Sequence, residues 1–280
     1  MKNQMYLLVV MLFFKVFVFG QNHIEKLTKS IVEEGKMLYK SEMASWYGTD
    51  LFLENYTNKS NVGGYFSYGD GEITKCVFYS KEKTPKVIGT LSFDDSFSLQ
   101  TATTNLEERN FSKSEQELYK IRSKALQIIN SDTIFKFYKN TNYNIIPIIS
   151  NNERKVYILT GPQNSGVMIF GNDYLLTFDK KNKLLNRKQL HKNIIVTPYG
   201  EKTEDGNAIV GGMHTHLPET GDFITATDIC TLMLYEKIAG WESYAVVSEK
   251  YLSTWDCLKD ELTVVPMKAV KKIIDSKEEE

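Results

Sequence analysis

The chain has 280 residues, of which 42% are hydrophobic and 25% are charged, a composition typical of a globular protein that can bury a sizeable core. Its 34 basic and 35 acidic side chains give a net charge of −1. This balance, with no basic stripe and no acidic block, argues against nucleic-acid binding and against a long solvated tail.

Residues 1–20 have the order of a secretory signal peptide. Lys2 precedes an apolar run over residues 5–19 that only Lys15 interrupts, and the small residue Gly20 stands at the predicted cleavage site. The run is short for a spanning helix, so an uncleaved N-terminal anchor is the alternative. We therefore expect a secreted or periplasmic protein with no stable membrane span after cleavage.

The three cysteines are Cys76, Cys230 and Cys257. Their odd number allows at most one internal disulfide, and the sequence leaves open whether any two of them pair. No C-x-x-C spacing occurs, which excludes a cysteine-based zinc ribbon. Cys230 stands in an apolar helical stretch, where a small buried residue is expected.

The segments after the signal predict a helix and a hairpin. Apolar residues recur at helical spacing over residues 23–45, with Lys and Glu between them. After Gly48, two aromatic-rich runs flank the Gly-Asp-Gly of residues 69–71, a pattern typical of a β-hairpin. Four aromatic residues are expected to form the hairpin core: Tyr65, Phe66, Phe78 and Tyr79.

The middle of the chain is rich in short strands. Residues 86–111 are rich in Ser, Thr, Asn and Asp and predict no regular element. A helix is predicted over residues 113–130, where Ser112 and Glu115 fit a capping box. Short apolar strands punctuated by Gly, Pro and Asn follow over residues 155–190.

The last part predicts a strand over residues 207–216, a helix over 225–238 and two closing strands, SYAVVS and YLSTWD. The tail is expected to form a frayed helix. The fold class is therefore α+β, with a mixed, strand-rich sheet flanked by helices.

The chain contains four histidines, and His214 and His216 stand one residue apart at the end of the predicted strand. Side chains alternate along a strand, so both imidazoles are expected on the same face. His191 is interpreted as a surface or strand-end residue, and His23 lies close to the signal segment.

Thr225 and Asp228 lie three residues apart in the first turn of the next helix, on one face. Two imidazoles and one carboxylate, with a fourth position open to water, form the ligand set of a catalytic zinc site. Zinc there lowers the pKa of the bound water and polarises a carbonyl group. Thr225 and Asp228 also fit an imperfect capping box, but that interpretation does not account for the two histidines.

The pattern H-x-H, eight residues, T-x-x-D over residues 214–228 resembles the motif H-x-H-x(7–10)-S-x-x-D of the JAB/MPN (JAMM) metalloprotease family. The resemblance implies a cytidine-deaminase-like JAMM core in which His214, His216 and Asp228 bind one Zn²⁺. It also implies cleavage of an amide bond in a peptide or protein substrate. Thr225 stands where the family has Ser and would help to hold the oxyanion.

The family also requires a glutamate on an early strand as general base for the zinc-bound water. Glu42 is the best positional candidate, although it also fits a solvated residue at the end of the first helix. The other candidates are Glu54, Glu72, Glu204 and Glu219. Without a clear base, the alternative is a catalytically inactive JAMM-like module that binds a partner or a metal.

The long spacing between Glu42 and His214 requires a large insertion in a JAMM core. The expected organisation is a signal peptide (1–20), an N-terminal part of the core (21–85), an insertion (86–150), a C-terminal part with the metal site (151–262) and a tail (263–280). Two other folds with an H-x-H motif are excluded by counting. Too few residues follow His216 for an amidohydrolase barrel, and no later histidine completes a cupin site.

Overall fold

The computed structural model describes the backbone of residues 2–150 and 152–278 and the side chains of residues 24–150 and 152–276. Four α-helices and fourteen β-strands in this part of the chain form a mixed α+β fold, which confirms the predicted class. The predicted signal peptide, residues 1–20, lies outside the residues whose side chains are described. Within the described residues, no helix combines the length and the apolar character needed to cross a membrane.

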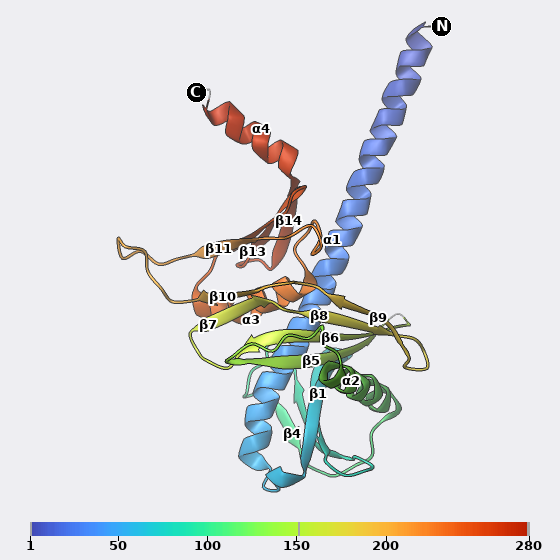
Figure 1. Cartoon of the computed structure of the whole chain (residues 1–280), viewed down its shortest axis with the longest axis vertical. Helices are drawn as coiled ribbons and strands as arrows, with labels where there is room; N and C mark the ends of the chain where they lie inside the picture. The colour runs from blue at the N-terminus through green and yellow to red at the C-terminus, as the bar shows by residue number, and fades with distance from the viewer. Residues whose placement is uncertain (1, 151, 279–280) are drawn as a thin grey trace.

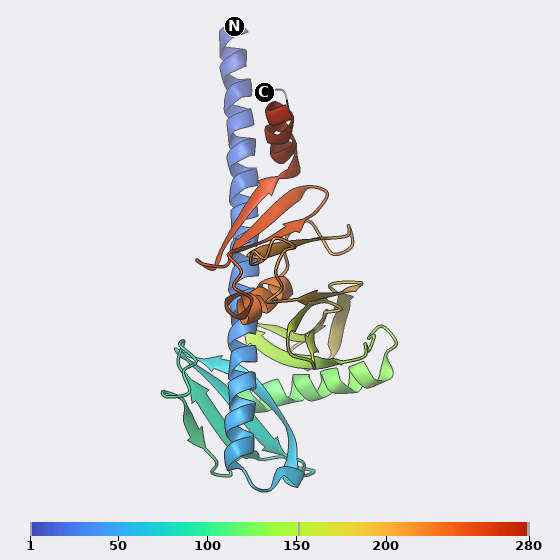
Figure 2. The ribbon, with the colours of Figure 1, turned by 90° about the vertical axis from the view of Figure 1, so that its left-hand side faces the viewer.

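A long helix, α1 (Lys2–Asn55), runs along the molecule, and the sheets follow one another along it (Figures 1 and 2). The first predicted helix therefore continues well past its expected end, through Gly48. A Cβ atom at Gly48 would lie 2.8 Å from the Cβ of Cys76. A Cβ atom at Gly35 would likewise lie 2.8 Å from the Cβ of Ile229. Both glycines thus serve close packing of the helix instead of ending it.

The first sheet is antiparallel, has the order β1-β2-β3-β4, and packs against the C-terminal part of α1. Its strands are β1 (Val62–Asp70), β2 (Ile73–Ser80), β3 (Val87–Phe93) and β4 (Thr103–Asn105). The predicted hairpin is confirmed as β1–β2, with Asp70 paired to Ile73 and Gly71 at a φ of 66° in the turn. Of the four aromatic residues expected in its core, Phe66, Phe78 and Tyr79 are buried and Tyr65 is half-buried.

The second sheet is antiparallel, has the order β5-β6-β8-β9, and lies between helix α2 and the helices α1 and α3. Its strands are β5 (Thr141–Ser150), β6 (Glu153–Pro162), β8 (Tyr174–Phe178) and β9 (Leu184–Gln189). Helix α2 (Lys113–Ser131) begins with the predicted capping box of Ser112 and Glu115. Alternate residues of β6 face opposite sides, so that Val156 packs with α2 and Tyr157 packs with α1 and α3.

The remaining strands form a small antiparallel pair and a third sheet. The pair is β7 (Val167–Gly171) with β10 (Ile194–Pro198), and the sheet contains β11 (Gly211–Thr215), β12 (Ser243–Val247), β13 (Tyr251–Asp256) and β14 (Glu261–Pro266). Strands β11 and β12 are parallel and are joined by α3 (Ala226–Ala239), whereas the other neighbours are antiparallel. A parallel crossover brings the start of its helix near the end of the preceding strand.

The differences from the predicted elements are local. The strand predicted over residues 207–216 is the shorter β11, and five strands were not predicted: β3, β4, β5, β10 and β14. The predicted tail helix is α4 (Met267–Glu278). Residues 86–150 are divided between two sheets, since β3 and β4 complete the first and β5 begins the second.

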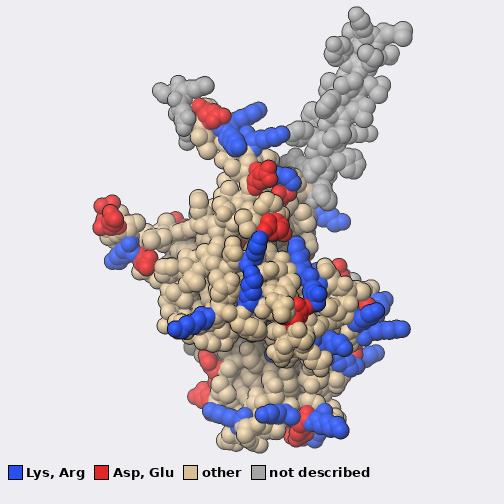
Figure 3. All heavy atoms as spheres, viewed as in Figure 1, with Lys and Arg blue, Asp and Glu red and all other residues tan. Residues whose placement is uncertain are grey.

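The three cysteines, Cys76, Cys230 and Cys257, are all buried and unbridged. The expectation that Cys230 is a buried residue is thus confirmed. On the face of the molecule that Figure 3 shows, acidic and basic side chains are interspersed.

Candidate metal centre

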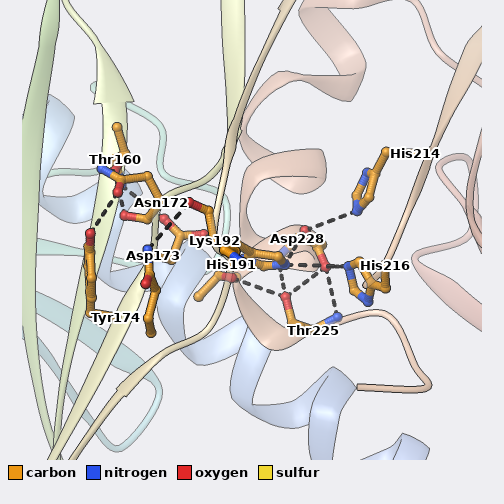
Figure 4. Close-up of polar contacts among 12 residues, drawn as sticks. Thr160, Asn172, Asp173, Tyr174, His191, Lys192, His214, His216, Thr225 and Asp228 are labelled. Carbon is orange, nitrogen blue, oxygen red and sulfur yellow. Dashed lines mark hydrogen bonds and ion pairs between the residues drawn. The ribbon is translucent and has the colours of Figure 1, made fainter. Parts of the chain in front are cut away.

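The end of β11 and the start of α3 bring the three predicted ligands together (Figure 4). The Nε2 atom of His214, in β11, lies 3.6 Å from Oδ1 of Asp228. The Nε2 atom of His216, directly after β11, lies 3.2 Å from Oδ2 of Asp228. His214 and His216 are each 7% exposed and Asp228 is 1% exposed. The two imidazoles therefore share one face of the strand, as predicted, and converge on a buried carboxylate.

A third histidine, His191, belongs to the same cluster. Its Nε2 atom lies 3.4 Å from Nε2 of His216 and 3.4 Å from Oδ1 of Asp228. The interpretation as a surface residue is wrong, because His191 is 8% exposed, although it does lie close to the end of β9. The third histidine of the cluster thus lies upstream of the H-x-H pair. One signal pointed upstream: three of the four histidines fall within residues 191–216.

Backbone hydrogen bonds between the turn before β8 and the turn before β10 place His191 in the interior. In the turns before β8 and before β10, the N–H of Leu190 donates to the carbonyl of Asp173 at 2.7 Å. The N–H of Asn172 donates to the carbonyl of Asn193 at 3.0 Å. This pairing places the Asp173 carboxylate beside the ring, with Oδ2 3.4 Å from Nδ1 of His191. The basic local sequence RKQLHKN gives no hint of these long-range contacts.

Two of the three imidazoles have a hydrogen-bond partner at Nδ1, on the side away from the cluster, and the third has a carboxylate nearby. The Nδ1 atom of His214 lies 3.1 Å from the hydroxyl oxygen of Tyr244. The Nδ1 atom of His216 lies 3.0 Å from the carbonyl oxygen of Phe223. The Nδ1 atom of His191 lies at ion-pair distance from the Asp173 carboxylate, 3.4 Å, and makes no hydrogen bond to a described residue. Such partners fix the ring orientation and leave Nε2 facing the centre, an arrangement typical of metal-binding histidines.

Asp228 is at once a helix cap and a member of the cluster. Its Oδ2 accepts hydrogen bonds from the N–H and the hydroxyl of Thr225, at 2.9 and 2.7 Å. Its Oδ1 is buried and has no hydrogen-bond partner among the described residues, and the same holds for Nε2 of His214. Buried polar atoms are normally paired, so these two atoms mark a position that suits a cation.

The distances among the donor atoms fit a single metal ion. The ligand atoms of His191, His214, His216 and Asp228 all lie within 4.8 Å of one another. The pairs given above are separated by 3.2–3.6 Å. A tetrahedral centre with bonds of about 2.0–2.1 Å has ligand atoms about 3.3–3.4 Å apart. This buried group can therefore hold a metal ion, and it contains no glutamate.

The charges of the cluster suit a cation. Burial alone would raise the pKa of Asp228, but His191 and His214 lower it well below its ordinary value. Burial alone would lower the pKa of His191, but Asp228 and Asp173 raise it to about 10. Burial lowers the pKa of His214, although Asp228 opposes the shift. Binding of a metal by His191 therefore requires loss of its proton.

The Thr225 hydroxyl is engaged by Asp228 on both sides. It donates to Oδ2 of Asp228, and it accepts from the N–H of Asp228 at 3.1 Å, which completes the capping box. A hydroxyl group has one proton, so a Thr225 hydroxyl bonded in this way does not donate to an oxyanion. In this geometry Thr225 holds Asp228 in place.

Glu42, the predicted general base, lies in α1 and apart from the cluster. Its Oε2 accepts a hydrogen bond of 2.5 Å from the side-chain amide of Asn144 in β5. It lines a cavity whose described walls include none of the four cluster residues. The four other glutamates considered are exposed: Glu54, Glu72, Glu204 and Glu219. Glu219 is the one nearest in sequence to the cluster, and it pairs with Lys192 at 3.6 Å.

No family model, curated protein or solved structure matches this chain. The centre is therefore interpreted from its own donor atoms. Three imidazole nitrogens and one carboxylate oxygen suit zinc, copper, iron or nickel, whereas magnesium and calcium prefer oxygen ligands.

Proposed function

We propose that this chain is a metal-binding protein whose centre holds one Zn²⁺ through four side chains: His191, His214, His216 and Asp228. The fourth donor, His191, carries the proposal. Structural zinc sites have four protein ligands, whereas catalytic sites keep one position for water. The low exposure of all four side chains supports a closed centre.

In this proposal the chain is a catalytically inactive JAMM-like module. The order of strand, H-x-H, loop and T-x-x-D helix supports the resemblance, and the unit β11–α3–β12–β13 would correspond to the cytidine-deaminase-like core. His191 occupies the coordination position that a hydrolytic water needs. The four-residue group also lacks the glutamate that activates such a water.

Zinc would act in this centre as a cross-link. The four ligands come from three segments: the turn between β9 and β10, the end of β11 and the first turn of α3. The polar groups of the ligands face one another at the cluster. One ion bound to all three segments would fix the crossover helix against the strand.

The test is metal analysis of the purified full chain. We expect one zinc per chain in the wild type and loss of zinc in His191→Ala and Asp228→Asn. Glu219→Gln, an exposed change next to the cluster, is the matched control and should retain zinc. Replacement by Co²⁺ should give the intense visible absorption of a tetrahedral centre. Unchanged zinc content and an unchanged cobalt spectrum in His191→Ala would remove His191 from the ligand set.

A second candidate function is the hydrolase implied by the resemblance, acting on a peptide or protein substrate. It is favoured by the pairing of His191 with Asp173, because a carboxylate-backed imidazole is a typical general base. In that function His214, His216 and Asp228 would hold the ion, which would lower the pKa of a water molecule, and His191 would be the base for that water. Hydrolysis of a peptide library by the zinc-loaded wild type, lost in His191→Ala variants that retain zinc, would support this function over the first.

We also propose that the protein is secreted or periplasmic, on the basis of the sequence of residues 1–20. Expression of the full chain with its native N-terminus should give a mature protein that begins after Gly20. N-terminal sequencing of the exported material tests this. A chain that keeps residues 1–20 and stays with the membrane fraction would favour the uncleaved anchor.

A further inference from the structure

A second polar site lies between α1, β5, β6 and α3. It is a cavity of about 310 Å³, a size that suits a small molecule. Its walls include the carboxyl group of Glu42, the amides of Asn142 and Asn144, and the aromatic rings of Tyr65, Trp46 and Tyr235. None of the four residues of the metal centre lines it.

Glu42 is the buried acid of this cavity. It is 9% exposed, and burial raises its pKa to about 7, although the hydrogen bond from Asn144 opposes the shift. That bond uses Oε2, and no other described side chain donates to either carboxyl oxygen. The one other ionisable acid in the described walls is Asp50, and these walls contain no basic residue. A buried acid without a cationic partner favours a ligand that supplies the cation.

Aromatic rings form the other part of the walls. The rings of Trp46 and Tyr235 lie 6.5 Å apart, centroid to centroid, at an angle of 46°. Tyr65 adds a third ring, and the guanidinium of Arg122, which is not part of the walls, lies 5.9 Å from its centroid. The faces of such rings attract cations, and clusters of them recognise ammonium groups.

We propose that this cavity binds a small organic amine in its protonated form, with Glu42 as counter-ion and the aromatic rings as its walls. The ammonium group donates to the free carboxyl oxygen of Glu42. The side-chain amides of Asn142 and Asn144 select polar substituents. This site is independent of the zinc centre, although Thr160 connects their surroundings: it lines the cavity, and its N–H donates to Asp173 at 3.0 Å.

Benzylamine and benzyl alcohol are the probes, because they share shape and differ in charge. Binding to the purified full chain is measured by calorimetry and by ligand-detected NMR. Benzylamine should bind the wild type at least about tenfold more tightly than benzyl alcohol, and Glu42→Gln should weaken benzylamine binding by about ten- to hundredfold. Glu54→Gln, an exposed change on the same helix, should bind as the wild type does.

The zinc content of every variant is measured in parallel. Normal zinc with lost amine binding in Glu42→Gln supports the cavity site and leaves the metal proposal untouched. Equal binding of the two probes, equal binding by Glu42→Gln, or no benzylamine binding to the zinc-loaded wild type overturns the proposal. A wild-type chain that contains no zinc but still binds benzylamine would contradict the metal centre and leave the cavity proposal standing.

Discussion

Helices α2 and α3 both begin with a capping box, but the acidic residue of the box has different further contacts in the two helices. Ser112 and Glu115 form a capping box in α2, and Thr225 and Asp228 form one in α3. Both acids are 1% exposed. In each helix, one carboxylate oxygen accepts the hydrogen bond that closes the box. The second oxygen distinguishes the two.

In α2 the second oxygen is saturated. Oε1 of Glu115 accepts from the Tyr68 hydroxyl at 2.9 Å and from Arg109 at 2.8 Å, and Arg109 also donates to Oε2 at 2.7 Å. In α3, Oδ1 of Asp228 has no hydrogen-bond partner among the described residues and faces imidazole nitrogens. A capping box therefore does not exclude a ligand role. The carboxylate oxygen that does not close the box distinguishes the two cases. In a structural acid it accepts hydrogen bonds, and in a candidate ligand it is unpaired and faces other ligand atoms.

The largest expected difference between the two capping boxes is the effect of metal removal on thermal stability. For a site filled to about 1,000 times its Kd, binding contributes about 4 kcal/mol, which for a chain of this size corresponds to a loss of about 10 °C in Tm. A chelator should therefore lower the Tm of the wild type and of Glu115→Gln, and added zinc should restore it. Asp228→Asn should melt at one temperature with or without chelator. A wild-type Tm that does not change when the metal is removed would contradict the cross-linking role.

Glu115→Gln should destabilise the protein without any dependence on metal. The change removes the charge-assisted bonds to Arg109, and we expect a loss of about 1–3 kcal/mol in the free energy of unfolding, measured with urea. Glu108→Gln is the control, since its pair with Lys86 is exposed to solvent and should contribute little to stability. Equal losses in both variants would show that burial of the Glu115 pair adds nothing.

The contribution of Glu115 should also depend on pH. Burial alone would raise its pKa, but Arg109 and the Ser112 N–H lower the pKa from 4.5 to about 2. Because the pKa is lower in the folded chain, the stabilisation is present above pH 4.5 and is lost as the pH falls towards 2. The difference in unfolding free energy between the wild type and Glu115→Gln should shrink over that interval. A difference that stays constant would argue against an ionised Glu115 as the stabilising form.

The smallest effects should come from the two N-caps. Ser112→Ala and Thr225→Ala should each cost about 1 kcal/mol of unfolding free energy, measured with metal removed. Thr225→Ala should in addition weaken zinc binding by about tenfold, because the hydroxyl orients a ligand. Thr225→Ser keeps the hydroxyl and should restore both quantities. Equal zinc affinity in Thr225→Ala and Ser112→Ala would mean that Thr225 caps the helix and has no role in zinc binding.

Local patterns predicted most of the fold. The β1–β2 hairpin, both capping boxes and the β11–α3 corner follow from residues close together in sequence, and each was recognised. Helix α1 was predicted too short, because a glycine that permits close packing, such as Gly48 against Cys76, has the same appearance in the sequence as one that ends a helix. Strands β3, β4, β5, β10 and β14 were not predicted.

Only part of the metal centre was predicted, because only part of it depends on residues that are close together in the sequence. His214, His216 and Asp228 belong to one strand–helix corner, so their convergence follows from alternation and helical spacing. His191 joins them through backbone pairing of two distant turns, and its partner Asp173 lies before β8. Tertiary contacts of this kind produce no periodic pattern in the sequence. Glu42, the general base that the family resemblance implies, lies in α1 and lines a different cavity.

Gly35 and Gly48 allow a single helix to touch both α3 and the first sheet without intervening side chains. A continuous helix is stiff, so each contact opens only when the element packed on α1 moves away from it. The buried thiols of Cys230 and Cys76 lie beside these two contacts. The rates at which the two thiols react with an alkylating reagent should therefore report separately on the opening of α3 and of the first sheet.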